Sequence, residues 1–99
     1  RGALLDVLLK TGARFKYMAD ELWGDAWPEE LAARATEGGF EWTSFLTMCR
    51  EDLQLEDREE CLRCLFRSLD DALAEVIEAE ELTEFLVDPI QRIHMRLKV

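Results

Sequence analysis

The stretch that decides the fold runs from residue 62 to residue 86 and reads LRCLFRSLDDALAEVIEAEELTEFL. Apolar side chains at both of its ends recur three and four residues apart, which is the spacing of one helix face. These apolar positions are Leu62, Leu65, Phe66, Leu69, Leu82, Phe85 and Leu86. We predict helices over Glu56–Leu69 and Ala79–Val87, joined by a loop that begins at Asp70.

This helix–loop–helix pattern resembles the EF-hand family. An EF-hand holds calcium in a 12-residue loop, with ligands at positions 1, 3, 5, 7, 9 and 12 and glycine at position 6. With Asp70 at position 1, all seven apolar residues fall where the family has them. Ile77 then stands at position 8, and Glu81 stands at position 12 as the bidentate acid. The resemblance covers residues 62–86.

The ligand positions of the same loop depart from the family. Positions 3 and 5 are Ala72 and Ala74, whose side chains carry no oxygen. Position 6 is Glu75, so a left-handed turn there would be strained. Calcium takes six to eight oxygen ligands, so we expect this loop to bind no metal. If calcium does bind, the carboxylates left to hold it are Asp70, Glu78 and Glu81.

Because EF-hands pair through position 8, the resemblance implies a degenerate partner hand nearer the N-terminus. Gly38, Phe40 and Ser44 fit positions 6, 8 and 12 of its loop. Its incoming helix would carry Phe15, Met18, Ala19 and Leu22. The loop would then run over Trp23–Ser44, too long for a ligand loop, with a helix at Pro28–Ala35 inside it.

The remaining segments also read as helices. We predict separate helices at Ala3–Lys10 and Ala13–Trp23, interrupted at Gly12. Thr43 or Ser44 could cap a further helix that runs to about residue 51. The predicted fold is therefore all-α: one compact multi-helix domain over residues 1–89, with an EF-hand-like pair. A basic C-terminal helix or tail over residues 90–99 follows the Asp88-Pro89 break.

Composition narrows the functional classes. The chain has 99 residues, 48% of them hydrophobic, and a net charge of −10. Such an acidic surface repels phosphate, so we expect neither nucleic acid nor a membrane as a partner, whereas basic peptides fit its sign. We expect a cytoplasmic setting with reduced thiols, because no secretory signal precedes the three cysteines. The chain opens on Arg1 rather than Met, so we expect a fragment of a longer protein.

Other chemical signals are weak. Cys61-x-x-Cys64 would need Cys49 and His94 to complete a zinc site, and free thiols are the better interpretation. The acidic run 57–60 reads as a solvated helix face. The sequence pairs no nucleophile with an evident base and has no phosphate-binding loop, so we predict a protein that is not an enzyme and uses no cofactor.

Partner binding is the class that remains. The candidate partner-binding residues are Trp23, Trp27, Trp42, Met48, Phe66 and Phe85. The first four are the candidates for an exposed anchor surface, and the alternative is that the tryptophans fill the core. The basic tail, with Arg92, Arg96 and Lys98, could lie on the acidic domain, in cis or from a neighbour, or could begin the next element.

We therefore predict a calcium-independent, non-catalytic interaction or scaffolding module that binds a helical or basic segment of another protein. One alternative is a calcium-sensing EF-hand regulatory domain whose loop uses backbone oxygens. Another is an unrelated helical bundle with a structural or dimerising role.

Overall fold

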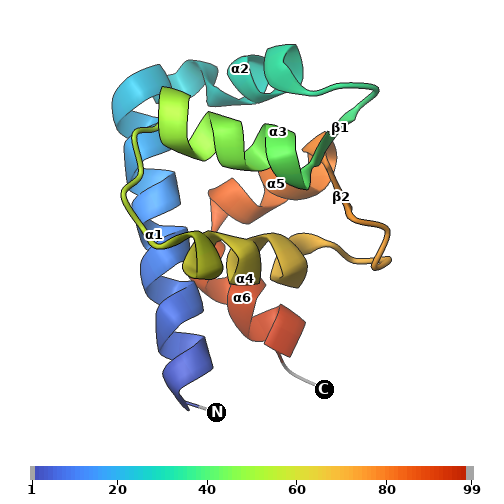
Figure 1. Cartoon of the computed structure of the whole chain (residues 1–99). Coiled ribbons are helices and arrows are strands. Elements are labelled where there is room, and N and C mark those ends of the chain that lie inside the picture. Colours follow the sequence, from blue (N-terminus) through green and yellow to red (C-terminus); the bar gives the residue numbers. More distant parts are fainter. Residues whose placement is uncertain (1, 98–99) are drawn as a thin grey trace.

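Two helix–strand–helix units lie against each other in the computed structural model, which describes residues 2–97 (Figure 1). The first unit consists of α1 (Gly2–Trp23), β1 (Gly39–Glu41) and α3 (Trp42–Thr47), and the second of α4 (Glu59–Leu69), β2 (Val76–Glu78) and α5 (Ala79–Val87). A 3₁₀ turn (Gly24–Ala26) and α2 (Trp27–Arg34) separate α1 from β1, a π-helical turn (Met48–Asp52) follows α3, and α6 (Pro89–Leu97) ends the described chain. The result is a compact, mostly helical domain.

The two units are joined by a short antiparallel ribbon between β1 and β2. Phe40 pairs with Ile77 at its centre, and both side chains are fully buried. These are the residues that the sequence placed at position 8 of two successive loops. A Cβ on Gly39 would lie 2.9 Å from Val76 Cγ1 and 3.0 Å from the Ile77 carbonyl oxygen. Glycine at this position therefore lets the strands approach closely.

A cluster of aromatic rings forms the centre of the core. Phe15 of α1 stacks on Phe45 of α3 at a centroid distance of 5.8 Å. Phe45 lies 5.5 Å from Phe66 of α4, and Phe85 of α5 meets Phe15 edge-on at 6.2 Å. Each of the four helices contributes one ring. The apolar faces read from the sequence thus converge on one shared core.

Helix α1 is continuous, so the predicted interruption at Gly12 is wrong. Gly12 is buried, and a Cβ there would lie 2.9 Å from Ile93 Cδ1 and 3.1 Å from Phe85 Cζ. The glycine serves close packing between helices rather than a bend. Leu22, expected on the buried face of α1, is half-exposed.

Other boundaries shift by a few residues. Helix α3 begins at Trp42, ahead of both Thr43 and Ser44, and its N-cap residue, Glu41, makes no capping bond through its side chain. Helix α4 begins at Glu59 rather than Glu56. Helix α5 has the predicted bounds. Helix ends are less sharply encoded than amphipathic faces, which explains this pattern.

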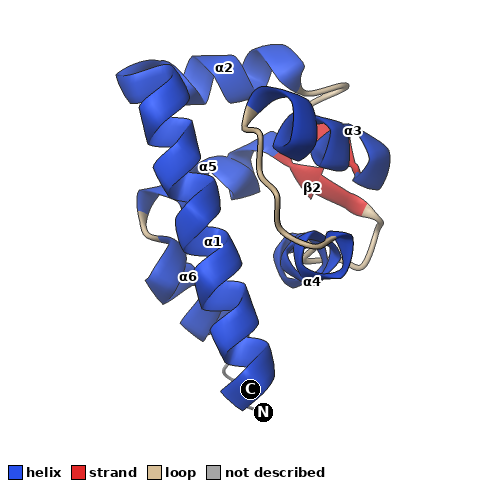
Figure 2. Cartoon of the chain, turned by 60° about the vertical axis from the view of Figure 1, so that its left-hand side comes forward, coloured by secondary structure: helices blue, strands red, loops and turns tan. Residues whose placement is uncertain are grey.

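Helix α6 lies alongside α1 (Figure 2) and also packs against α4 and α5. Its residue Ile93 joins the core. The basic segment therefore lies on the domain in cis, which is one of the positions expected for it. Lys98 and Val99, at the end of this predicted helix, lie outside the described residues, as does Arg1. Among residues 2–97, no helix combines the length and the apolar character needed to cross a membrane.

Candidate functional site

The loop between α4 and β2 is closed by the carboxylate of Asp70. Its Oδ1 accepts a hydrogen bond from the Ala74 amide at 3.0 Å, and its Oδ2 accepts one from the Glu75 amide at 2.8 Å. Asp70 is buried. Leu73 and Glu75 adopt left-handed conformations, with φ of 53° and 64°. The left-handed turn expected at Glu75 is therefore present, although the residue is not glycine.

Arg63 of α4 forms an ion pair with Glu75. Its Nη2 lies 3.1 Å from Glu75 Oε1. Its guanidinium lies over two aromatic rings, 4.9 Å from the centroid of Trp42 and 5.6 Å from that of Phe66. Stacking fixes the planar cation, and the fixed cation anchors the carboxylate above the loop.

Glu81, the last acid of the loop, is bound by an arginine from α6. Arg92 donates from Nε to Glu81 Oε2 at 3.0 Å and from Nη2 to Glu81 Oε1 at 2.9 Å. The two side chains are largely buried, with 14% of Glu81 and 22% of Arg92 exposed. Arg92 also pairs with Glu84. The hydrogen bond to Glu81 raises the pKa of Arg92, so the guanidinium stays charged.

The three carboxylates considered for calcium have different environments. Asp70 closes the loop, Glu81 accepts hydrogen bonds from Arg92, and Glu78 is exposed. All three line a hollow of about 300 Å³ beside the loop. Across the part of the chain that the structure describes, no group of three or more histidine, cysteine or acidic residues is arranged to hold a metal ion.

The candidate partner-binding residues divide into two groups. Met48, Phe66 and Phe85 are buried, so Met48, a candidate for an exposed anchor surface, is not exposed in this conformation. Trp23, Trp27 and Trp42 are half-buried at the edge of the core. Their role in partner binding stays a prediction, and in this conformation it would use only the outer edges of the tryptophans.

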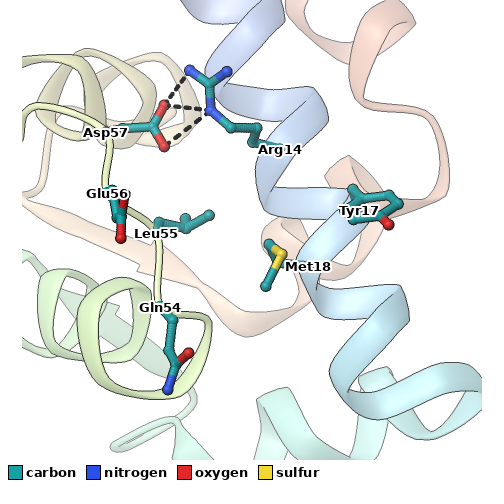
Figure 3. A pocket seen from close by; sticks show the side chains of 7 residues that line it. All are labelled: Arg14, Tyr17, Met18, Gln54, Leu55, Glu56 and Asp57. Carbon is teal, nitrogen blue, oxygen red and sulfur yellow. Dashed lines mark hydrogen bonds and ion pairs between the residues drawn. The ribbon is translucent and has the colours of Figure 1, made fainter.

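A groove that the sequence did not indicate runs between α1 and the segment 54–57 (Figure 3). Its volume is about 560 Å³, and the side chains of Met18 and Leu55 point toward each other across it. Arg14 Nη2 lies 2.6 Å from Asp57 Oδ2 at one end, and its Nε donates to both carboxylate oxygens. The side chain of Asp57 is 2% exposed, so reading it as part of a solvated face is wrong. No sequence signal links these residues, since their contact depends on the tertiary fold.

The thiols are not gathered into one site. Cys49 is buried, and burial raises the pKa of its thiol. Cys61 and Cys64 are half-buried on α4, and His94 is exposed on α6. Cys49 is thus held in the protonated, unreactive form.

Comparison with known proteins returns no significant match to a family model, to a curated protein or to a solved structure.

Proposed function

We propose that this chain is a calcium-independent, EF-hand-like interaction module that binds a helical or basic segment of another protein and has no catalytic role. The observation that carries the proposal is the use of the loop carboxylates. Asp70 and Glu81, the first and last acids of the loop, are both engaged by groups of the chain itself. The loop thus has internal substitutes for the contacts that a calcium ion would make.

The pairing of the two units supports the EF-hand-like part of the proposal. Phe40 and Ile77 are partners in the ribbon, as position-8 residues of paired hands would be. Leu73 and Glu75 supply the left-handed turn, and an aspartate at the first loop position accepts hydrogen bonds from the loop amides. Residues 70–75 are not helical, which argues against an unrelated bundle of continuous helices.

Electrostatics supports calcium independence. Arg92 places a positive charge against both oxygens of Glu81, where a bidentate acid would otherwise face the ion. A cation entering the loop would have to displace this guanidinium and would also find no side-chain oxygen at Ala72 or Ala74. The gain from binding would be offset by the loss of two charge-assisted hydrogen bonds, each worth about 1.5–3 kcal/mol.

The acidic surface supports a basic partner. The chain carries 22 acidic and 12 basic residues, and complementary charge speeds association and discriminates against acidic partners. A helical partner fits the helix-in-groove mode, in which one amphipathic helix lays its apolar face against others.

A calcium titration tests the metal part of the proposal. The full chain is titrated with CaCl₂ from about 1 µM to about 1 mM, a range that spans the affinities of calcium sensors. Tryptophan fluorescence and melting temperature are recorded, and MgCl₂ serves as the control. Neither signal should change. A transition in the micromolar range, with several degrees of stabilisation, would overturn calcium independence and favour the calcium-sensing alternative.

A binding assay tests the partner part. Basic amphipathic peptides and matched peptides with each Lys and Arg replaced by Glu are titrated into the chain in EDTA. The basic set should bind, and added calcium should leave the affinity unchanged. Equal binding of both sets, or binding by neither, would count against the proposed function.

A further inference from the structure

Helix α6 differs in charge from the rest of the chain on which it packs. It is the last described element, and it lies across a surface formed by α1, α4 and α5. Residues 90–99 contain no acidic residue and carry Arg92, Arg96 and Lys98, in contrast to the acidic chain as a whole. The segment thus combines the charge and the amphipathic pattern that the proposed function assigns to a partner.

The surface beneath α6 buries the side chain of Ile93. Ile93 is 1% exposed and lies against Gly12 of α1 and Phe85 of α5. A methyl group on Gly12 would lie 2.9 Å from Ile93 Cδ1, closer than van der Waals contact allows. Glycine is an unfavourable residue in the middle of a helix as long as α1. Its presence there is explained by the room that it leaves for Ile93.

An acidic pair beside this surface receives the neighbouring arginine. Glu81 accepts two hydrogen bonds from Arg92, and Glu84 pairs with the same guanidinium. Glu81 and Glu84 are neighbours on one face of α5 because they are three residues apart. The surface beneath α6 therefore contacts two adjacent residues of a bound helix, namely an arginine and the aliphatic residue that follows it.

The covalent link between α5 and α6 is short. Asp88 alone separates α6 from α5, with a non-helical conformation at φ −152° and ψ 82°. Asp88 Oδ1 accepts a hydrogen bond from the Gln91 amide, and Pro89 stands at the first helical position. An N-cap aspartate bonded to an amide of the first turn and a proline at the first helical position are typical of a helix N-terminus. Ile90 and Met95 are exposed on α6.

From these contacts we infer that α6 occupies in cis the docking surface of a partner, and that the partner presents a basic amphipathic helix with an arginine and an aliphatic residue in the places of Arg92 and Ile93. This inference rests on the proposed function and assigns the surface to it. The partner helix displaces α6, so the strength with which α6 docks sets the partner concentration that is needed for binding.

Tethering determines how high that partner concentration is. A short linker gives a tethered segment an effective concentration in the millimolar range, so an identical free helix competes poorly with α6. A mutation that weakens the docking of α6 in cis by a given factor lowers the partner concentration needed for binding by that factor. The gain stops where the intrinsic affinity of the free helix limits binding. Mutations in α6 should therefore strengthen the binding of a ligand helix that does not carry them.

The test uses a labelled peptide of residues 88–99, DPIQRIHMRLKV, together with the 99-residue chain and its variants in EDTA. Fluorescence anisotropy measures its binding to the wild-type chain, to Arg92→Glu, to Ile93→Ala and to the control Ile90→Ala, which changes an exposed residue of α6. Circular dichroism checks that each chain is folded. Should Ile93→Ala fail to fold, Arg92→Glu decides, because it changes no residue of the core.

We expect the peptide to bind Arg92→Glu and Ile93→Ala at least tenfold more tightly than it binds the wild-type chain or Ile90→Ala. A peptide that carries Arg92→Glu should lose at least tenfold on the opened chains. Equal binding of the wild-type peptide to wild type and Arg92→Glu, or equal binding of both peptides, would overturn the inference. Dimers that disappear with Arg92→Glu would also overturn it, because α6 would then be exchanged between copies.

The inference and the proposed function can fail separately. A basic helix that binds wild type and Arg92→Glu equally, without calcium, would uphold the interaction role and overturn the assignment to the α6 surface. If the residue 88–99 peptide gains affinity on the opened chains while unrelated basic helices bind none of them, the α6 surface stands and the general interaction role fails.

Discussion

Leu73 has a side chain that is 82% exposed and a backbone φ of 53°, in the left-handed region. Such a conformation costs a non-glycine residue about 1–2 kcal/mol. Replacing Leu73 by glycine removes this cost, and the greater conformational freedom of glycine in the unfolded chain offsets only part of the gain. We expect Leu73→Gly to raise the free energy of unfolding by about 0.5–1 kcal/mol. Urea denaturation measures this change.

Ala13→Gly is the matched control for Leu73→Gly. Ala13 is exposed within α1, where glycine should lower the free energy of unfolding by about 0.5–1 kcal/mol. If both substitutions destabilise the protein equally, the left-handed turn at Leu73 is not the conformation in solution.

The three cysteines should differ in their rates of reaction with a disulfide reagent. Cys49 is buried and the pKa of its thiol is raised by that burial, whereas Cys61 and Cys64 are half-buried on α4. Because the thiolate is the reacting species, a disulfide reagent at pH 8 should modify Cys61 and Cys64 in the native protein and Cys49 only after unfolding. Mass spectrometry of the labelled peptides identifies the order. Equal rates at all three would show that the site of Cys49 opens readily.

The loop between α4 and β2 offers a test at the scale of one element. Ala72→Asp, Ala74→Asp and Glu75→Gly together restore oxygen ligands and the turning glycine. If the backbone is EF-hand-like, calcium should then raise the melting temperature, with a Kd of about 10⁻³–10⁻⁵ M. Isothermal titration calorimetry measures the affinity.

Adding Arg92→Ala to this triple variant should tighten calcium binding by at least roughly tenfold, because the ion would no longer displace two charge-assisted hydrogen bonds to Glu81, each worth about 1.5–3 kcal/mol. Adding Glu81→Ala instead should abolish the response. No calcium binding by either chain that retains Glu81 would contradict an EF-hand-like loop.

At this scale the sequence predicted what depends on local periodicity. The bounds of α5 follow from an amphipathic run with a proline break. The EF-hand resemblance placed Phe40 and Ile77 at equivalent loop positions, and these two residues are partners in the ribbon, although the predicted fold contained no strands. Gly12 was read as an interruption because its reason, the contact with Ile93, is tertiary. The remaining failures have the same origin.

Contacts between distant segments were not predictable from spacing. The sequence alone indicates a solvated carboxylate at Asp57, and only the tertiary fold brings Arg14 to it. In the same way, the hydrogen bonds from Arg92 to Glu81 depend on the packing of α6. Met48 lies on an apolar helix face whether that face is exposed or buried, and only the packing of the helices decides that it is buried. The groove beside Arg14 was missed for the same reason.

The charge of the whole molecule predicts how its stability responds to salt. The net charge is −10, and the domain measures 35 × 27 × 23 Å. At about 0.01 M salt the screening length is about 30 Å, so acidic groups repel one another across the whole domain, and at about 0.15 M it falls to about 8 Å. We expect the melting temperature to rise by a few degrees over this range of NaCl. Exposed ion pairs oppose this trend weakly, at about 0–1 kcal/mol each.

Differential scanning calorimetry at the two salt concentrations measures the shift. A melting temperature that falls with NaCl would mean that the ion pairs outweigh the net repulsion. The largely buried pair of Arg92 and Glu81 would then be the first to examine, with Arg92→Met as the variant that removes the positive charge of the pair.

The ribbon has a consequence for how the chain is made. Residues 39–41 leave the ribosome well before residues 76–78, and at about 5–20 residues per second the interval is on the order of seconds. During that time the first half has an open strand edge and the unfilled places of Phe66 and Phe85 in the aromatic cluster. Nascent chains in this state are exposed to misassociation with one another, and synthesis of β2 and α5 ends the hazard.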